Sequence, residues 1–148
     1  MVVLVLALAA ADFQPSPQLS PKQVVEAQLE ALRANDSPRK DSGIEVAFRF
    51  ASPANKIATG PLKKFKTIVR SEAYAPMIDH STHEFGEVEL LEDTAAVPVI
   101  LTASDGRQFG YVFLLGRQRG GPLRDCWMTD GVQLVGEAPA KRTGGISL

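Results

Sequence analysis

The chain has 148 residues, which is the length of one domain and enough to bury roughly two-thirds of the surface that its unfolded form would expose. Sixteen Lys and Arg residues against seventeen Asp and Glu residues give a net charge of −1, so charge gives no reason to expect nucleic-acid binding. The single cysteine, Cys126, excludes an intramolecular disulfide, and the chain is therefore compatible with a reducing or an oxidising compartment.

The first predicted segment, residues 1–19, is an apolar leader followed by a proline-rich linker. Residues 2–11 are uninterruptedly apolar and end in small residues, which is typical of a signal peptide and its cleavage site. The run is about half of the ~20 residues that a spanning helix needs, so we expect no membrane span. We expect an export or organelle-import signal. The alternatives are an apolar helix or strand docked on the domain and a misassigned gene start.

A helix is predicted to begin after Ser20. This serine stands at the N-cap, Pro21 at the first helical position, and Gln23 where a capping box requires it. Residues 35–38 contain Asn, Asp, Ser and Pro, which end the helix. The apolar residues that recur at helical spacing, and that we expect to be buried, are Val25, Leu29 and Leu32.

Two further helices are predicted between residues 43 and 70. From Gly43 the apolar positions recur at three and four residues, and Ser52-Pro53 ends this helix or starts another turn. Thr59-Gly60-Pro61 then opens a third helix by the same combination of cap and proline. We expect its cationic face to be solvated, with contact to an acidic partner as the alternative. The cations are Lys63, Lys64, Lys66 and Arg70.

The last third predicts an antiparallel meander, because it contains four apolar runs of strand length: residues 85–91, 94–101, 109–115 and 126–135. Pro98 indicates an edge or a bulge, and Asp105-Gly106 predicts a hairpin turn. The second and third runs are apolar on both faces. The helices would cover one face, and the N-terminal segment, a partner or a second copy of the chain would cover the other.

These elements predict the fold class α+β, with N-terminal helices packed on a curved antiparallel sheet. The single domain is expected at residues 20–135, with a disordered tail at 136–148. The sequence has no phosphate-binding glycine loop, no Cys-x-x-Cys pair and no Gly-x-Ser-x-Gly elbow. We therefore predict no cofactor.

The two histidines, His80 and His83, are the candidates for a metal site or for proton transfer. Acidic residues flank them at positions 79 and 84. On an extended strand two rings three residues apart point to opposite faces, and only a turn or helix would bring them together. We therefore predict ordinary polar residues of a loop or strand edge.

Asp130 and Tyr111 are the candidates for acid–base chemistry. An apolar cavity would favour the protonated form of Asp130, as a general acid or base requires, whereas burial with a structural hydrogen bond or an outward position would make it non-catalytic. Tyr111 would donate into a cavity or pack in the core with its hydroxyl at the rim. No histidine or lysine lies near Cys126 in the sequence to activate its thiol, so we expect no nucleophile there.

Residues 43–55, 59–61, 85–86 and 126–132 resemble an uncharacterised domain family of bacteria and photosynthetic eukaryotes, over about residues 20–135. That family is similar in layout to the ketosteroid-isomerase-like, or nuclear-transport-factor-like, cystatin-like cone. The resemblance implies helices wrapped by a bent antiparallel sheet. The superfamily contains isomerases, dehydratases and cyclases as well as non-catalytic binding and dimerising modules. Its isomerase mechanism needs an aspartate base and a tyrosine in the cone, for which Asp130 and Tyr111 are the stand-ins.

We expect a non-catalytic module that binds a small apolar ligand in the cone, or that joins a partner or second copy through the sheet. The alternative is a cofactor-independent isomerase or lyase acting on a small apolar ligand. If the leader is genuine, the protein is exported or enters an organelle such as the chloroplast or its lumen. Residues 52–55 and 127–131 are expected to meet, either as a structural contact or as a pocket rim. The pocket or structural residues are Phe48, Ser52, Asn55, Trp127, Thr129 and Asp130.

Overall fold

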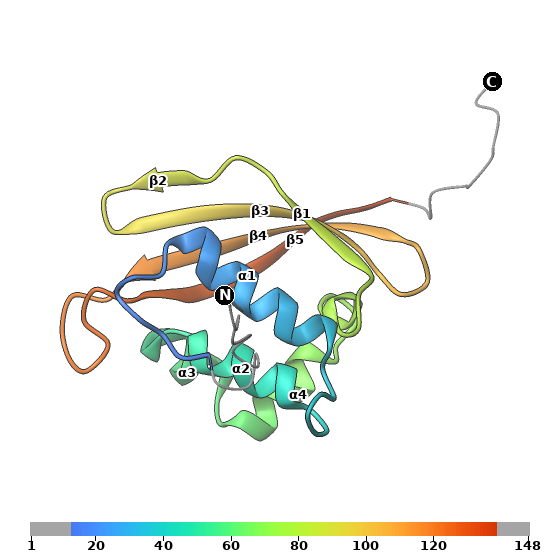
Figure 1. Ribbon diagram of the computed structural model, residues 1–148, viewed down its shortest axis with the longest axis horizontal. Coiled ribbons are helices and arrows are strands. Elements are labelled where there is room, and N and C mark those ends of the chain that lie inside the picture. Colours follow the sequence, from blue (N-terminus) through green and yellow to red (C-terminus); the bar gives the residue numbers. More distant parts are fainter. Residues whose placement is uncertain (1–12, 139–148) are drawn as a thin grey trace, which may run out of the picture.

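The computed structural model describes residues 13–138. Helices come first in this range: α1 (Pro21–Arg33), α2 (Ser42–Phe50), α3 (Pro53–Thr59), α4 (Leu62–Val69) and the short 3-10 helix η2 (Ala75–Met77). The strands follow: β1 (Thr82–Phe85), β2 (Glu89–Leu91), β3 (Thr94–Thr102), β4 (Gln108–Arg117) and β5 (Trp127–Ala138). They form one antiparallel sheet in the order β1-β3-β4-β5, in which β2 also pairs with β3. The helices lie on one side of the sheet (Figure 1), which confirms the predicted α+β class.

Helix α1 begins at the predicted capping box. The Ser20 hydroxyl accepts a hydrogen bond from the Gln23 amide at 3.2 Å, and Gln23 Oε1 accepts one from the Ser20 amide at 2.9 Å. Two amides that would lack partners at a helix start are thereby satisfied. Val25, Leu29 and Leu32 are buried, as predicted, and α1 contacts both β3 and β5.

Helices α1 and α2 pack closely because Gly43 has no side chain. A Cβ atom on Gly43 would lie 2.2 Å from the Ala31 carbonyl oxygen. The residue that caps α2 comes from the connection after α1, since Asn35 Oδ1 accepts a hydrogen bond from the Ile44 amide at 3.0 Å. The second predicted helix is confirmed. Asn35, eight residues before Gly43, reaches the start of this helix because the chain folds back after α1.

The Ser52-Pro53 pair starts a separate helix, α3. The Ser52 hydroxyl accepts a hydrogen bond from the Asn55 amide at 3.1 Å, and Pro53 occupies the first turn. The helix predicted from residues 59–61 is α4, which begins directly after Pro61. The cap followed by a proline holds for α3 only, because Pro61 is itself the N-cap of α4 and Thr59 and Gly60 end α3.

The predicted single strand at residues 85–91 is wrong, because residues 86–88 separate β1 from β2. Both strands pair with β3, but the register shifts by one residue between them: Phe85 lies opposite Val99, and Glu89 lies opposite Ala96. Pro98 stands at this break. Its carbonyl accepts a hydrogen bond from the Gly86 amide at 2.9 Å. The nitrogen of Pro98, which has no hydrogen to donate, points to the same side of β3 and therefore also faces the interruption. Sequence reasoning expected an edge or a bulge at Pro98; β3 is instead an inner strand, and the interruption between β1 and β2 lies beside Pro98.

One face of the sheet is buried and the other is largely open in the described residues. The buried face carries Ala95, Val97, Val99, Leu101, Phe109, Tyr111, Phe113 and Leu115. On the outer face, Ile100 is 56% exposed and Leu114 37% exposed. No described helix covers this outer face (Figure 1).

At the two ends of the described range the chain departs from the predicted boundaries. Phe13 and Leu19 pack against the core, although they belong to the predicted linker. Strand β5 continues to Ala138, past the predicted end at residue 135. The apolar run at 2–11 and residues 139–148 lie outside the described residues. Among the described helices, none has the length and apolar composition needed to span a bilayer.

Candidate functional site

A largely apolar cavity of about 200 Å³ lies between the helices and the inner face of the sheet. Every helix from α1 to α4 contributes to its wall, together with β4 and β5. The apolar wall is formed by Leu32, Ala47, Phe65, Ile68, Val69, Tyr74, Met77, Phe113 and Val132, and the polar side chains are Gln28, Asn55 and Thr59.

Gln28 offers this cavity a hydrogen-bond acceptor. Its Nε2 donates to the Thr129 hydroxyl at 2.8 Å and to the Val24 carbonyl at 3.3 Å. Because a carbonyl only accepts, the Val24 contact identifies the amide nitrogen. Gln28 Oε1 accepts no hydrogen bond from the described residues. Every fully buried side-chain polar atom among these residues has a hydrogen-bond partner, so Gln28 Oε1 is not fully buried. This oxygen therefore remains accessible at a residue that lines the cavity.

The start of α3 is joined to the last strand beside the cavity. The Thr129 carbonyl accepts hydrogen bonds from the Ser52 amide at 2.8 Å and from Asn55 Nδ2 at 3.1 Å. Ala51 and Thr129 also form an isolated parallel bridge. The structure thus contains the contact that the sequence predicted between residues 52–55 and 127–131, and Asn55 lines the cavity as well.

Two predicted aromatic site residues do not line this cavity. Phe48 packs its ring 5.2 Å from the ring of Phe65, which does line it. Trp127 is buried at the start of β5, with the Arg117 guanidinium 5.8 Å from its ring centre. Phe48 therefore contacts the cavity wall through Phe65, whereas Trp127 lies outside that wall.

The structure places Tyr111 and Asp130 on opposite faces of the sheet. Tyr111 is buried on the inner face, and its hydroxyl donates to the Ala73 carbonyl at 2.7 Å. Burial raises the pKa of Tyr111, so its phenol stays protonated. Asp130 is exposed on the outer face, where its Oδ2 lies 2.7 Å from the position a Cβ atom would take on Gly116. The pair that the isomerase mechanism would need is therefore not assembled.

A bulge in β5 explains the outward position of Asp130. Thr129 pairs with Leu115 and Gly131 pairs with Leu114, which leaves Asp130 without a partner residue on β4. A strand without a bulge would carry Asp130 and Val132 on one face, but Val132 lines the cavity and Asp130 does not. Cys126, just before β5, is buried, and burial raises the pKa of its thiol.

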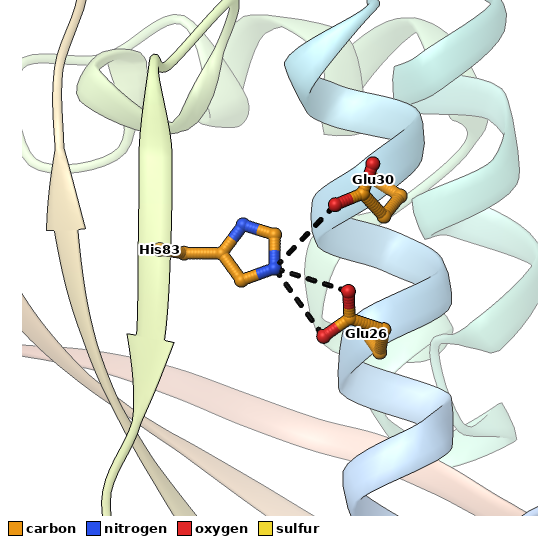
Figure 2. Close-up of side chains that lie close together, drawn as sticks. All are labelled: Glu26, Glu30 and His83. Atoms are coloured by element: carbon orange, nitrogen blue, oxygen red, sulfur yellow. Dashed lines mark hydrogen bonds and ion pairs between the residues drawn. The ribbon is translucent and has the colours of Figure 1, made fainter.

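His83 lies beside Glu26 and Glu30 of α1 (Figure 2), and His80 lies next to His83. Asp79 has a positive φ of 55°, and this turn before β1 brings the rings of His80 and His83 to 5.1 Å between centres. His83 Nε2 lies 3.2 Å and 3.3 Å from the two carboxylate oxygens of Glu26 and 3.7 Å from Glu30 Oε1. The rings approach because the chain turns at Asp79, which is the condition under which the sequence allowed them to come together.

The hydrogen bonds of His80 fix the orientation of His83. His80 Nδ1 lies 2.7 Å from the Met77 carbonyl and must donate to it, while its Nε2 lies 2.8 Å from His83 Nδ1. Burial lowers the pKa of His80 and so favours its neutral form. Neutral His80 accepts at Nε2, so His83 donates from Nδ1 and turns Nε2 toward the glutamates. Glu26 and Glu30 were not among the predicted site residues. Their spacing of four on α1, which puts both on one helix face, was the available signal.

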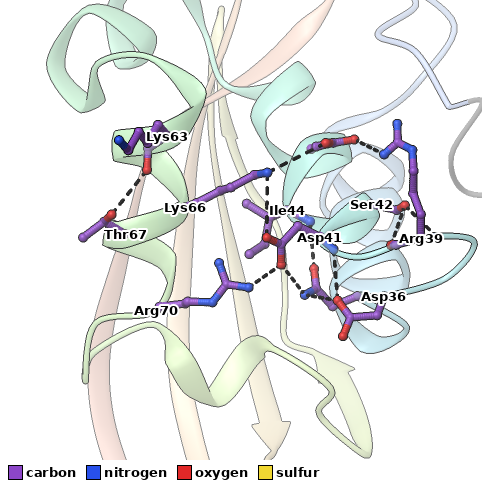
Figure 3. Close-up of polar contacts among 11 residues, drawn as sticks. Asp36, Arg39, Asp41, Ser42, Ile44, Lys63, Lys66, Thr67 and Arg70 are labelled. Atoms are coloured by element: carbon purple, nitrogen blue, oxygen red, sulfur yellow. Dashed lines mark hydrogen bonds and ion pairs between the residues drawn. The ribbon is translucent and has the colours of Figure 1, made fainter.

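The cationic face of α4 is only partly solvated. Lys63 and Lys64 are exposed, but Lys66 Nζ lies 3.7 Å from Asp41 Oδ2, and Arg70 donates a hydrogen bond to Asp41 Oδ1 (Figure 3). The Asp41 side chain is buried at the start of α2. The Arg70 hydrogen bond lowers the pKa of Asp41. Two of the four cations, Lys66 and Arg70, therefore contact an acidic residue of the same chain.

The family model of DUF4864, a domain of unknown function, matches residues 16–142. The chain belongs to this family. The match agrees with the resemblance of the sequence to an uncharacterised domain family. Neither a curated protein nor a solved structure gives a significant match.

Proposed function

We propose that this protein binds a small, largely apolar ligand in the cavity between its helices and its sheet. The observation that carries the proposal is the cavity itself, with its apolar wall and about 200 Å³ of space. An apolar cavity of about 150 Å³ is enough to bind benzene in another protein, so this one suits a ligand of roughly ten non-hydrogen atoms. A mostly apolar pocket with few polar groups is also the usual form of a small-molecule site.

The arrangement of the chain supports the same proposal. We infer a nuclear-transport-factor-like cone, because the helices cover one face of an antiparallel sheet and the cavity lies between the two layers. The polar side chains of the cavity add a preference within the ligand class. A ligand with one N–H or O–H group would donate to Gln28 Oε1, which has no partner among the described residues.

The proposal is tested by isothermal titration calorimetry of the full chain with indole, a bicyclic aromatic that carries one N–H group. We expect binding, and binding of 1-methylindole about 5-fold weaker, because the methylated nitrogen has no hydrogen to donate and one hydrogen bond contributes about 1 kcal/mol. Equal affinity for both probes would contradict the role of Gln28. The absence of binding at millimolar indole would contradict the proposal.

A matched pair of variants locates the binding. Val132 lines the cavity and is half-buried, so Val132→Phe fills the space with a ring and should abolish indole binding. Val135, on the same strand, is 63% exposed and does not line the cavity, so Val135→Phe should bind like the wild type. Unchanged indole affinity in Val132→Phe would place the ligand elsewhere.

A second candidate function is self-association through the outer face of the sheet. Leu91, Ile100 and Leu114 are exposed, and their register places all three on the face opposite to the helices. Contiguous apolar side chains on a surface favour burial against another chain. Light scattering at micromolar concentration should give twice the mass of one chain, and Ile100→Lys should give the mass of one chain. A monomeric mass for the wild type would remove this candidate.

A further inference from the structure

We propose that Glu26, Glu30 and His83 form a binding site for a divalent zinc ion, separate from the ligand cavity. Two of these residues lie on α1 and one lies on β1, so the ion would bridge the first helix and the first strand (Figure 2). The cavity uses Gln28 and Leu32 of the same helix. At 100° per residue, these positions lie on the opposite side of α1 from Glu26 and Glu30. The two sites are therefore independent.

Three electron-pair donors converge at the proposed site. His83 Nδ1 lies 2.8 Å from His80 Nε2, so Nε2 is the ring nitrogen that faces the two carboxylates. Two carboxylates this close repel one another unless a cation lies between them. The Arg33 guanidinium is 3.6 Å from Glu30 Oε1, but both side chains are about half exposed, so this contact offsets little of the repulsion.

The distances between the three ligand atoms also fit a zinc site. With zinc–ligand bonds of about 2.0 to 2.1 Å, the ligand atoms of a tetrahedral site lie about 3.4 Å apart. His83 Nε2 lies 3.2 Å from Glu26 Oε1 and 3.7 Å from Glu30 Oε1, and the three ligand atoms lie within 4.8 Å of one another. Small rotations of the two half-exposed glutamate side chains would complete the geometry.

A hydrogen bond to His80 holds the ring of His83 in place. A metal-binding histidine normally donates its other ring N–H to a fixed acceptor, which sets the tautomer and the orientation of the ring. His83 Nδ1 has this partner in His80, which is itself held by the Met77 carbonyl. His80 is thus a positioning residue and not a ligand. One imidazole and two carboxylates suit zinc, with a water molecule as the fourth ligand.

Zinc titration of the untagged, chelator-treated full chain tests the site by calorimetry. We expect one zinc ion per chain in the wild type and an affinity at least 10-fold lower in Glu26→Gln, which keeps the size of an exposed side chain and should fold normally. The matched control is Glu84→Gln, the same substitution next to His83 but on the exposed outer face of β1, which should leave the affinity unchanged. Val132→Phe should also bind zinc normally, because the ligand cavity is separate.

The alternative occupant of this site is a proton on His83 Nε2, which would make an ion pair with Glu26. Nitrogen NMR of the imidazole rings distinguishes the two. If zinc binds, the His83 Nε2 resonance moves on zinc addition and the His83 Nδ1 proton is retained. A resonance that stays at the protonated position in excess zinc would overturn the proposal. Equal zinc affinities in Glu26→Gln and Glu84→Gln would also overturn it, because they would show an adventitious ion only.

Discussion

Arg70, at the C-terminal end of α4, donates a hydrogen bond to the buried carboxylate of Asp41, at the start of α2. Asp41 also accepts a hydrogen bond from Asn35 Nδ2 at 3.2 Å. Its backbone has a positive φ of 63°, a conformation that Asp and Asn adopt more readily than most residues. The pair therefore fixes α4 to the connection between α1 and α2. All three of these helices line the cavity.

Asp41→Asn should destabilise the fold, because it keeps the size and backbone conformation of the residue but removes the charge that Arg70 and Lys66 face. We expect a loss of about 2 kcal/mol in the free energy of unfolding at pH 7, which is typical of a hydrogen bond to a charged group. Urea denaturation measures it. The control is Asp125→Asn, at an exposed aspartate that also has a positive φ and that should change little. A loss of equal size in both variants would contradict the role of Arg70.

The effect of Asp41 should depend on pH. Because Arg70 lowers the pKa of Asp41 in the folded chain, the unfolded chain takes up the proton first. The stabilisation is therefore complete above the unfolded pKa of about 3.9 and is lost as the pH falls through the lower folded pKa. The stability difference between wild type and Asp41→Asn should be constant from about pH 7 to about pH 5 and should shrink below about pH 4. A difference that persists undiminished at the acid end would contradict this assignment.

Gly43→Ala tests the close packing of α1 on α2. In an open helix this substitution stabilises by about 0.5 to 1 kcal/mol. Here the new Cβ atom would lie 2.2 Å from the Ala31 carbonyl oxygen, so the helices must separate. Overpacking of this kind costs about 1 to 3 kcal/mol, and a net destabilisation is expected in thermal or urea unfolding. Gly120→Ala, where nothing lies near the added atom, is the control. A stabilised Gly43→Ala variant would show that the two helices pack less tightly.

Tyr111→Phe should lower stability by about 1 to 2 kcal/mol, because it leaves the Ala73 carbonyl without the hydrogen bond that the phenol donates. Tyr111 does not line the cavity, so the affinity for indole should remain at the wild-type value. Denaturation and calorimetry on the same sample measure both quantities. An unchanged stability combined with lost indole binding would assign Tyr111 to the ligand instead of the core.

Cys126 should react slowly with iodoacetamide in the folded protein. The thiol is buried, and burial raises its pKa, so the reactive thiolate is scarce. In urea the same residue should be alkylated at the rate of a free thiol, which mass spectrometry can follow. Rapid alkylation of the folded chain at neutral pH would contradict the burial of Cys126.

Local signals in the sequence predicted the elements that depend on local chemistry. The capping box at Ser20 and Gln23 gave the start of α1, and the hairpin at Asp105-Gly106 connects β3 to β4 as expected. The split of residues 85–91 was missed, because the break depends on how β1 and β2 pair with β3 around Pro98. Pairing partners far away in the chain decide such a break.

The candidate site was predictable only in part, for the same reason. The contact of Ser52 and Asn55 with Thr129 was expected from the family resemblance. The face of Asp130 was left open, because the bulge that separates Asp130 from Val132 depends on how β5 pairs with β4. The approach of His83 to Glu26 depends on the positive φ of Asp79 and on the packing of β1 beside α1, and neither is visible in the spacing of the residues.

The most direct test of ligand binding in the inner cavity is the set of intermolecular nuclear Overhauser effects between bound indole and the methyl groups of the protein. The cavity predicts contacts to Ile68, Val69 and Val132, which line it. Contacts to Ile100 and Leu114 instead would place the ligand on the outer face of the sheet and would contradict the proposed function.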